Sequence, residues 1–242
     1  EFRRVLFRSA GLTLFDCRNE PFHVSRYPRH QYLEFATIPP LVLQSLLYIE
    51  NRDLLSDEYP LTNPAVDWPR FANAALSQLG KQVGIQDHGS GGSTLATQLE
   101  KYRHSPDGLT VSGSEKLRQM VSASVRAYQD GPDTLKARQT IVRDYLNSVP
   151  LSAVPGHGEV HGMAEGLRVW YGADFNQVNQ HLASTASDPQ SLAQRGLALR
   201  EVLSLMIAQR RPSHYLAKGR DELAVLTDSH IRLLAQNQVI NP

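Results

Sequence analysis

The fold of this 242-residue chain is constrained most by one short stretch, in which two glycines are followed by two hydroxyl residues and by leucines four residues apart. Gly91-Gly92 allows a tight turn, and Ser93 and Thr94 can cap a helix that follows. Leu95 and Leu99 are four residues apart, so they share one face of that helix. The unpaired amides at such a helix start form a natural site for an anion. By spacing alone, an ordinary loop with a helix cap explains the same pattern.

Proline and glycine residues divide the rest of the chain into segments with helical spacing of apolar residues. We expect helices over residues 40–53, 68–79, 95–104, 114–129, 134–146, 163–171, 195–210 and 221–238. Alternating apolar and polar residues predict short strands at 11–16 and 23–29. Loops or irregular segments are expected at 54–69, 84–92, 105–113 and 152–162. The pattern predicts a mostly α fold with a small β element near the N-terminus.

Composition excludes several classes of protein. Hydrophobic residues make up 41% of the chain, which is typical of a globular core. The 25 Lys and Arg residues nearly balance 24 Asp and Glu residues, so no nucleic-acid partner is expected. A single cysteine, Cys17, excludes an internal disulfide framework. No apolar run reaches the roughly 20 residues that span a bilayer, so we expect this chain to be soluble or peripheral.

Five motifs in order resemble those of glycosyltransferase family 51, the peptidoglycan-polymerising domain of penicillin-binding proteins and monofunctional transglycosylases. Glu50-Asn51-Arg52 is similar to the first motif and Gly91 to Lys101 to the second. The third to fifth are represented by Glu115 to Gln119, Tyr145-Leu146-Asn147 with Trp170-Tyr171-Gly172, and Glu201 with Pro212-Ser213. The resemblance covers residues 11–215. Residues 1–9 match nothing in it, and we interpret them as a non-native flank that replaces a natural N-terminus, with 10–242 forming one domain.

The resemblance implies the roles of the site residues. Glu50 corresponds to the catalytic base, and a carboxylate suits this role because a sugar hydroxyl attacks only as its proton is removed. Lys101 corresponds to the lysine that contacts the donor diphosphate, and Lys116 and Arg118 would stabilise the same leaving group. The substrate-binding set implied is Asn51, Arg52, Ser93, Thr94, Gln98, Lys101, Lys116 and Arg118. A divalent cation at the diphosphate is compatible with this chemistry, although no metal-ligand motif is visible.

Gln119 is the most consequential departure from the family pattern, because the family has a second glutamate there. Glutamine keeps the shape of glutamate but cannot carry its charge. Glu115 lies one helical turn earlier on the same face, where its carboxylate could substitute. The catalytic set is therefore expected to be Glu50, Glu115 and Gln119. The alternative is a degenerate domain that binds lipid II or a partner without catalysis, and a lysozyme-like hydrolase is a weaker third hypothesis.

The fold implied by the resemblance is a lysozyme-like domain with two lobes around a cleft. The activity implied is polymerisation of lipid II into glycan strands, with inversion at the anomeric carbon and release of undecaprenyl diphosphate. Its partners would be lipid II, the growing strand and the bacterial membrane, at the extracytoplasmic face. One rival signal is His157-Gly158-Glu159-Val160-His161, whose side chains are potential zinc ligands. The glycines argue against a helix that holds both histidines on one face, so a loop is favoured.

Overall fold

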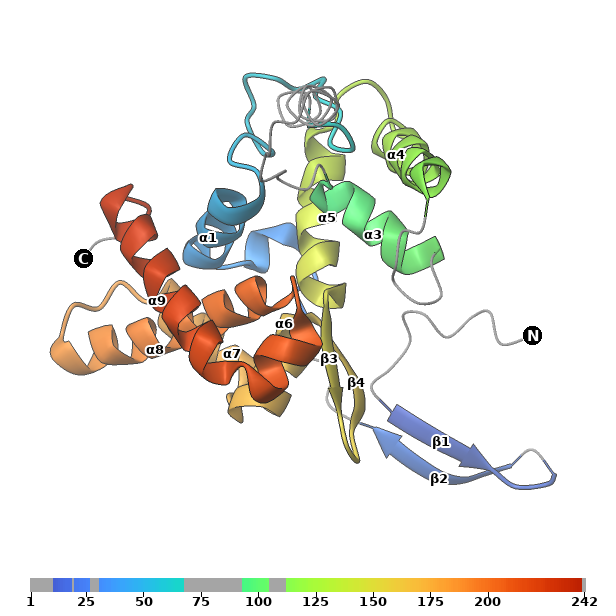
Figure 1. Cartoon of the computed structure of the whole chain (residues 1–242), viewed down its shortest axis with the longest axis vertical. Coiled ribbons are helices and arrows are strands. Elements are labelled where there is room, and N and C mark those ends of the chain that lie inside the picture. The colour runs from blue at the N-terminus through green and yellow to red at the C-terminus, as the bar shows by residue number, and fades with distance from the viewer. Residues whose placement is uncertain (1–10, 19, 27–30, 68–92, 105–111, 241–242) are drawn as a thin grey trace, which may run out of the picture. The chain divides into compact units, whose positions relative to one another are not determined.

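The computed structural model describes residues 11–18, 20–26, 31–67, 93–104 and 112–240 (Figure 1). The interpretation of residues 1–9 and the predictions of a helix at 68–79 and a glycine-rich loop at 84–92 lie outside these residues. The chain divides into two compact units, the first formed by Glu1–Leu33 and Asn147–Leu233 and the second by Glu34–Leu146 and Leu234–Pro242. The described chain is mostly helical with small antiparallel strand pairs, which confirms the predicted fold class.

The second unit contains most of the residues that were predicted to form the site. Its elements are η1 (Phe35–Thr37), α1 (Pro40–Glu50), α3 (Leu95–His104), α4 (Gly113–Ala127) and most of α5 (Leu135–Ser148). Helix α1 begins at Pro40 as predicted, because proline fits the first turn of a helix. It ends at Glu50 rather than at residue 53, and Asn51 has an extended backbone. The end of α1 therefore presents the carboxylate of the first motif.

Arg138 on α5 organises the segment that follows Glu50 and Asn51. Its side chain is 0% exposed, and its guanidinium donates hydrogen bonds to four backbone carbonyls of residues 54–60. The shortest of these, 2.8 Å and 2.9 Å, reach the carbonyls of Leu54 and Ser56. Burial lowers the pKa of Arg138 below its usual range. The carbonyls of this irregular segment, which was predicted from the sequence, are not paired within a helix or strand. The buried guanidinium of Arg138 satisfies them and so holds the segment in place.

Helices α3 and α4 pack against each other through small side chains and one ion pair. Ala96 on α3 and Ala123 on α4 belong to one buried cluster with Ala65. Arg126 on α4 lies 2.8 Å from the carboxylate of Glu100 on α3, and Glu100 is 1% exposed. Alanines let the two backbones approach closely, and the arginine neutralises a carboxylate that would be costly to bury alone. This packing holds the second and third motifs next to each other.

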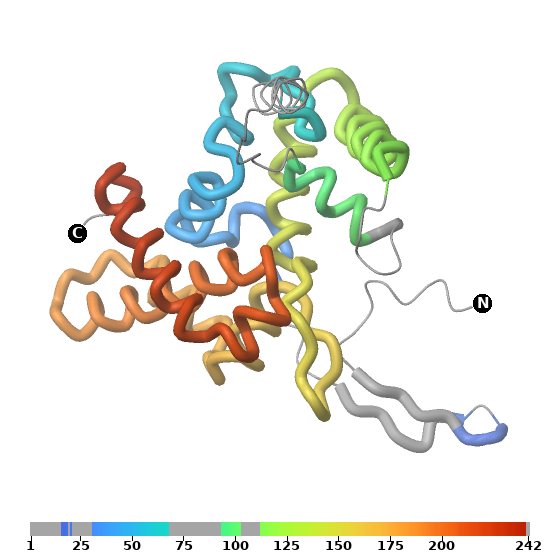
Figure 2. The backbone as a smooth tube through the Cα atoms, viewed as in Figure 1, coloured from blue at the N-terminus to red at the C-terminus, as the bar shows by residue number. Residues whose placement is uncertain are grey.

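The first unit begins with a hairpin of β1 (Gly11–Phe15) and β2 (Pro21–Arg26). The two strands are antiparallel, with Leu12 opposite Ser25 and Leu14 opposite His23. The predicted β element near the N-terminus is therefore confirmed, although the second strand begins two residues earlier and ends three residues earlier than predicted. Figure 1 draws the two strands as neighbouring arrows, and Figure 2 shows the course of the backbone through the helices α4 and α5.

A second hairpin replaces the loop that was predicted at residues 152–162. It consists of β3 (Pro150–Val154) and β4 (Gly158–His161), which pair antiparallel. The prediction was wrong because the glycines were interpreted as a sign of irregular backbone. Gly156 and Gly158 instead adopt positive φ angles of 80° and 96° at the turn between the strands.

Besides α8 (Pro189–Ala208), whose second half is almost entirely buried, the first unit has further helical segments. They are α6 (Gly162–Gly166), the π-helical segments η2 (Leu167–Tyr171) and η3 (His214–Lys218), α7 (Phe175–Ala183) and α9 (Arg220–Gln236). Helix α7 was not predicted, and α8 begins six residues earlier than expected. Asp188 caps α8 by accepting a hydrogen bond from the backbone amide of Ser191, and Pro189 follows at the first helical position.

Candidate active site

The carboxylate of Glu50 and the amide of Gln98 meet in the second unit. Nε2 of Gln98 lies 3.4 Å from Oε2 of Glu50 and donates a hydrogen bond to it. Both side chains are half-buried. Glu50 is the last residue of α1 and Gln98 lies in the first half of α3, so two helices fix the contact. The structure therefore brings together the predicted base of the first motif and a predicted binding residue of the second.

Tyr102 lies on the same helix as Gln98, although it was not among the predicted site residues. It lies four residues after Gln98 on α3, so the two side chains share one face of the helix. Burial and the neighbouring charge of Glu50 together raise the pKa of Tyr102 to about 12. The phenol of Tyr102 therefore keeps its proton at neutral pH. The i, i+4 spacing from Gln98 was the signal in the sequence that could have identified it.

Asn51 and Arg52, which follow Glu50, contact residues that are close to them in the sequence. Oδ1 of Asn51 accepts a hydrogen bond of 3.0 Å from the backbone amide of Asp53, which forms a local turn. The exposed guanidinium of Arg52 lies 4.0 Å from the centre of the Tyr48 ring, in a cation–π contact. Arg52 is thus held over α1 as a cation at the rim of the site, close in sequence to Glu50.

Thr94 and Thr97 cap the start of α3 in a reciprocal arrangement. The backbone amide of Thr97 donates to the hydroxyl of Thr94, at 3.3 Å, and the amide of Thr94 donates to the hydroxyl of Thr97, at 2.8 Å. Both residues are buried, whereas Ser93 is exposed. This is the geometry of a capping box with threonine in place of the usual Glu or Gln. Thr97 therefore stabilises the start of the helix that carries Gln98.

The charged residues of α3 and α4 occupy different environments. Lys116 and Arg118 are exposed on α4, and Lys101 is half-buried on α3. Glu115 lies in the first turn of α4, where its backbone amide donates to the hydroxyl of the N-cap residue Ser112. A carboxylate at this position is stabilised by the helix dipole.

Gln119 points toward the interior of the second unit and is 6% exposed. It shares the buried face of α4 with Ala123 and Ala127. Glu115 precedes it by one turn and is half-buried. Both residues lie on α4, which packs on α3, the helix that carries Gln98.

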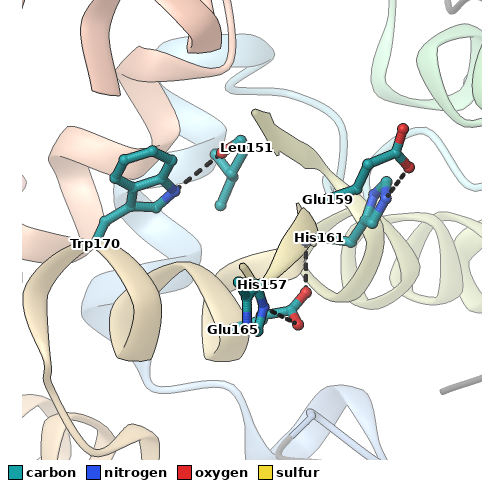
Figure 3. Close-up of polar contacts among 6 residues, drawn as sticks. All are labelled: Leu151, His157, Glu159, His161, Glu165 and Trp170. Atoms are coloured by element: carbon teal, nitrogen blue, oxygen red, sulfur yellow. Dashed lines mark hydrogen bonds and ion pairs between the residues drawn. The ribbon is translucent and has the colours of Figure 1, made fainter. Parts of the chain in front are cut away.

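The two histidines of the rival zinc motif contact separate carboxylates in the first unit (Figure 3). Nε2 of His157 lies 2.9 Å from Glu165, and Nε2 of His161 lies 3.1 Å from Glu159. Glu165 also accepts the backbone amide of His161, so it fastens β4 to α6. In the described ranges, no group of three or more His, Cys, Asp or Glu side chains could hold a metal ion. Each of the two histidines is paired with a different carboxylate, so His157 and His161 do not share one metal site.

Residues of the fourth motif make structural contacts in the first unit. The side-chain amide of Asn147 exchanges hydrogen bonds of 2.9 Å and 2.8 Å with the backbone amide and carbonyl of Tyr32. A Cβ at Gly162 would collide with the backbone of Asn147, and Gly162 has a φ of 75°, so glycine is required there. Trp170 donates to the carbonyl of Leu151 at 2.9 Å (Figure 3). These contacts position the β3–β4 hairpin and its neighbouring helices.

The described chain is mostly helical, and Glu50 at the end of α1 accepts a hydrogen bond from Gln98 on α3. A family model described as Transglycosylase matches residues 18–235. The chain therefore belongs to the transglycosylase family, glycosyltransferase family 51, and its enzyme class is that of a peptidoglycan glycosyltransferase. A search among curated proteins gives no significant match. Among the residues described, no helix combines the length and apolar character needed to cross a membrane.

Proposed function

We propose that this domain polymerises lipid II into glycan strands. The donor is the growing strand on undecaprenyl diphosphate, and the acceptor is the 4-hydroxyl of the next disaccharide. The new glycosidic bond forms as the bond from the anomeric carbon to the diphosphate breaks, with inversion of configuration. The diphosphate leaves with the electron pair, and the acceptor proton passes to a carboxylate. The observation that carries the proposal is the contact between Glu50 and Gln98.

Glu50 supplies the base in this proposal. It stands at the end of α1, half-buried, and Gln98 holds one of its oxygens. A base that removes the hydroxyl proton in the transition state contributes about 10²–10⁴-fold in rate. A carboxylate that is held by two helices can meet the acceptor hydroxyl in one orientation, which lowers the entropic part of the barrier.

Cationic side chains bind the diphosphate in this proposal. Lys116 and Arg118 are exposed on α4, and Lys101 lies one turn after Gln98 on α3. They provide charge that stabilises the departing diphosphate more strongly than the ground state. Ser93, which is exposed beside the start of α3, is a candidate donor to the same oxygens, and the helix start favours an anion.

The second candidate function is a domain that binds lipid II or a partner without turnover. Gln119 favours it, because a side chain that cannot titrate occupies the buried position of the family's second glutamate. We favour the enzyme, since Glu50 retains a partner from the second motif. The membrane partner and the extracytoplasmic location belong to the same proposal, because lipid II is anchored in the bilayer and its disaccharide is polymerised outside the cell.

The proposal is tested by incubating the protein with fluorescent lipid II in detergent and resolving the products by length. A ladder of glycan strands with release of undecaprenyl diphosphate is expected. Digestion of pre-formed glycan without strand growth would identify a hydrolase instead. Saturable binding of lipid II with neither product would identify the non-catalytic domain and contradict the proposal.

A further inference from the structure

The exposed side of α4 carries a row of apolar side chains. Leu117, Val121 and Val125 follow one another at four-residue intervals, so they line one side of the helix, and we call these three residues the α4 stripe. Each is more than half exposed, at 62%, 54% and 67%. The other side of α4 packs inward through Gln119 and Ala123. The α4 stripe is therefore a second apolar face, in addition to the face that packs inside the unit.

The apolar surface continues past the end of α4 onto the segment that follows α1. Tyr128, seven residues after Val121, lies on the same side of the helix, and its hydroxyl donates to the carbonyl of Leu61 at 2.8 Å. The side-chain amide of Asn63 donates to the hydroxyl of Ser124 at 2.9 Å, which fixes the segment at a second point. The side chain of Leu61 is itself exposed. The apolar surface therefore extends beyond the roughly 12 Å of helix that the α4 stripe spans.

Cations lie at one end of the α4 stripe. Arg118 directly follows Leu117 and precedes Val121 by three residues, so its exposed guanidinium borders the stripe. Lys116 is exposed on the turn where the stripe begins. All residues of α4 are described, and none of its exposed side chains is acidic. The third exposed cation of α4 is already used in the ion pair with α3. Positive charge is therefore available beside the first residue of the stripe, and apolar side chains follow it.

We propose that the α4 stripe binds the polyprenyl chain of the lipid-linked donor while the cations at its end bind the diphosphate. The inference rests on the proposed function, which places the diphosphate at Lys116 and Arg118. A polyprenyl diphosphate has an anionic head and an apolar tail, and α4 offers the complementary order, with cations first and apolar side chains next. Removal of the chain from water supplies the affinity, since a tenfold gain corresponds to about two buried methylene groups.

Calorimetric titration with a water-soluble analogue tests this inference without turnover. Farnesyl diphosphate is compared with inorganic diphosphate, which lacks the chain. The parent should bind farnesyl diphosphate at least about 10-fold more tightly. The double variant Val121→Gln/Val125→Gln should lose most of this chain-dependent gain, while its Kd for inorganic diphosphate and its melting temperature match those of the parent. Failure of the parent to bind farnesyl diphosphate, or equal Kd values for the two ligands, would overturn the inference.

Val225→Gln is the matched control, because Val225 on α9 is as exposed as Val125, at 67%, and lies in the first unit. This variant should keep the full chain-dependent gain. An equal loss of the gain in Val225→Gln and in the double variant would show that the chain does not bind at the α4 stripe, which contradicts the inference.

A membrane surface is the competing occupant of the α4 stripe. Vesicles of phosphatidylglycerol without any polyprenyl lipid test it by co-sedimentation. If the double variant loses adsorption to these vesicles but keeps the chain-dependent gain for farnesyl diphosphate, the stripe is a membrane-binding surface and the inference is wrong.

The titration and the polymerisation assay separate this inference from the proposed function. If the parent polymerises lipid II and the double variant keeps the chain-dependent gain, the chain-binding role of the α4 stripe is wrong and the polymerase stands. If the parent makes no strands but its chain-dependent gain is lost in the double variant, the chain-binding role is supported and the catalytic proposal is wrong.

Discussion

The side-chain amide of Gln98 donates to the carboxylate of Glu50 although the two residues are 48 positions apart in the chain. This contact joins the end of α1 to the face of α3. It brings the first and second motifs together in one candidate site, and this proximity could not be predicted from the sequence. Three features support the same region: the capping box at the start of α3, the ion pair between α3 and α4, and the carbonyl cluster around Arg138.

Arg138→Met should destabilise the domain strongly. The substitution removes a fully buried guanidinium and leaves the carbonyls of Leu54 and Ser56 without their donor. Hydrogen bonds to a charged group are worth about 1.5–3 kcal/mol each, so we expect a loss of at least about 3 kcal/mol in the free energy of unfolding. Urea denaturation measures it. Lys136→Met, an exposed position on the same helix, is the control, and equal stability of the two variants would contradict the role of Arg138.

Arg126→Ala should weaken the packing of α3 on α4. The side chain of the arginine is 55% exposed but that of its partner Glu100 is only 2% exposed, so the substitution leaves a buried carboxylate without this cation. We expect a loss of about 1–3 kcal/mol in the free energy of unfolding, because the buried carboxylate loses a charge-assisted hydrogen bond while its desolvation cost remains. Differential scanning calorimetry compares this variant with Arg118→Ala, an exposed arginine on the same helix. A smaller effect of Arg126→Ala than of Arg118→Ala would show that the ion pair does not hold the helices.

Lys101→Ala and Lys116→Ala should each weaken the binding of lipid II with little change in melting temperature. One contact of an ammonium with phosphate is worth about 1.5–3 kcal/mol, or roughly 10-fold or more in Kd. The Kd for fluorescent lipid II is measured with Lys136→Ala as a matched control on α5. If the Kd of both alanine variants stays within twofold of the parent's Kd, the two lysines are solvated surface charges that do not bind the diphosphate.

Gln119→Glu and Glu115→Gln separate the enzyme from the binding domain. If the domain is an enzyme that uses Glu115, Glu115→Gln should slow polymerisation, and Gln119→Glu should restore or raise it. The melting temperature must be recorded in parallel, because position 119 is 6% exposed and a new carboxylate there carries a desolvation cost. Activity that is indifferent to Glu115→Gln would leave Glu50 acting without this second carboxylate. Turnover by neither variant nor the parent would favour the binding domain.

Local signals in the sequence predicted the elements that carry the site. Pro39-Pro40 located the start of α1, and Thr94 before Leu95 located the start of α3. These predictions succeeded because caps and proline act within a few residues of the helix end. Membership of family 51 could also be predicted, because motifs in the family's order and spacing are found along most of the chain.

Contacts between segments that are distant in the chain could not be predicted from the sequence. Nothing local in the sequence indicates that Arg138 would reach four carbonyls of residues 54–60, or that Glu100 would be buried beside Arg126. The β3–β4 hairpin was missed because Gly156 and Gly158 serve equally in loops and in tight turns between strands. Tertiary packing decides each of these cases.

The rate of lipid II polymerisation by Glu50→Gln tests the central claim most directly. The matched control is Glu58→Gln, an exposed glutamate in the segment that follows α1. Glutamine keeps the size of Glu50 and can still hydrogen-bond to Gln98, so folding and the Kd for lipid II should match the parent. We expect the variant to lose about 10²–10⁴-fold in kcat, while Glu58→Gln remains as active as the parent. Polymerisation by Glu50→Gln at the parent's rate would contradict the assignment of Glu50 as the base.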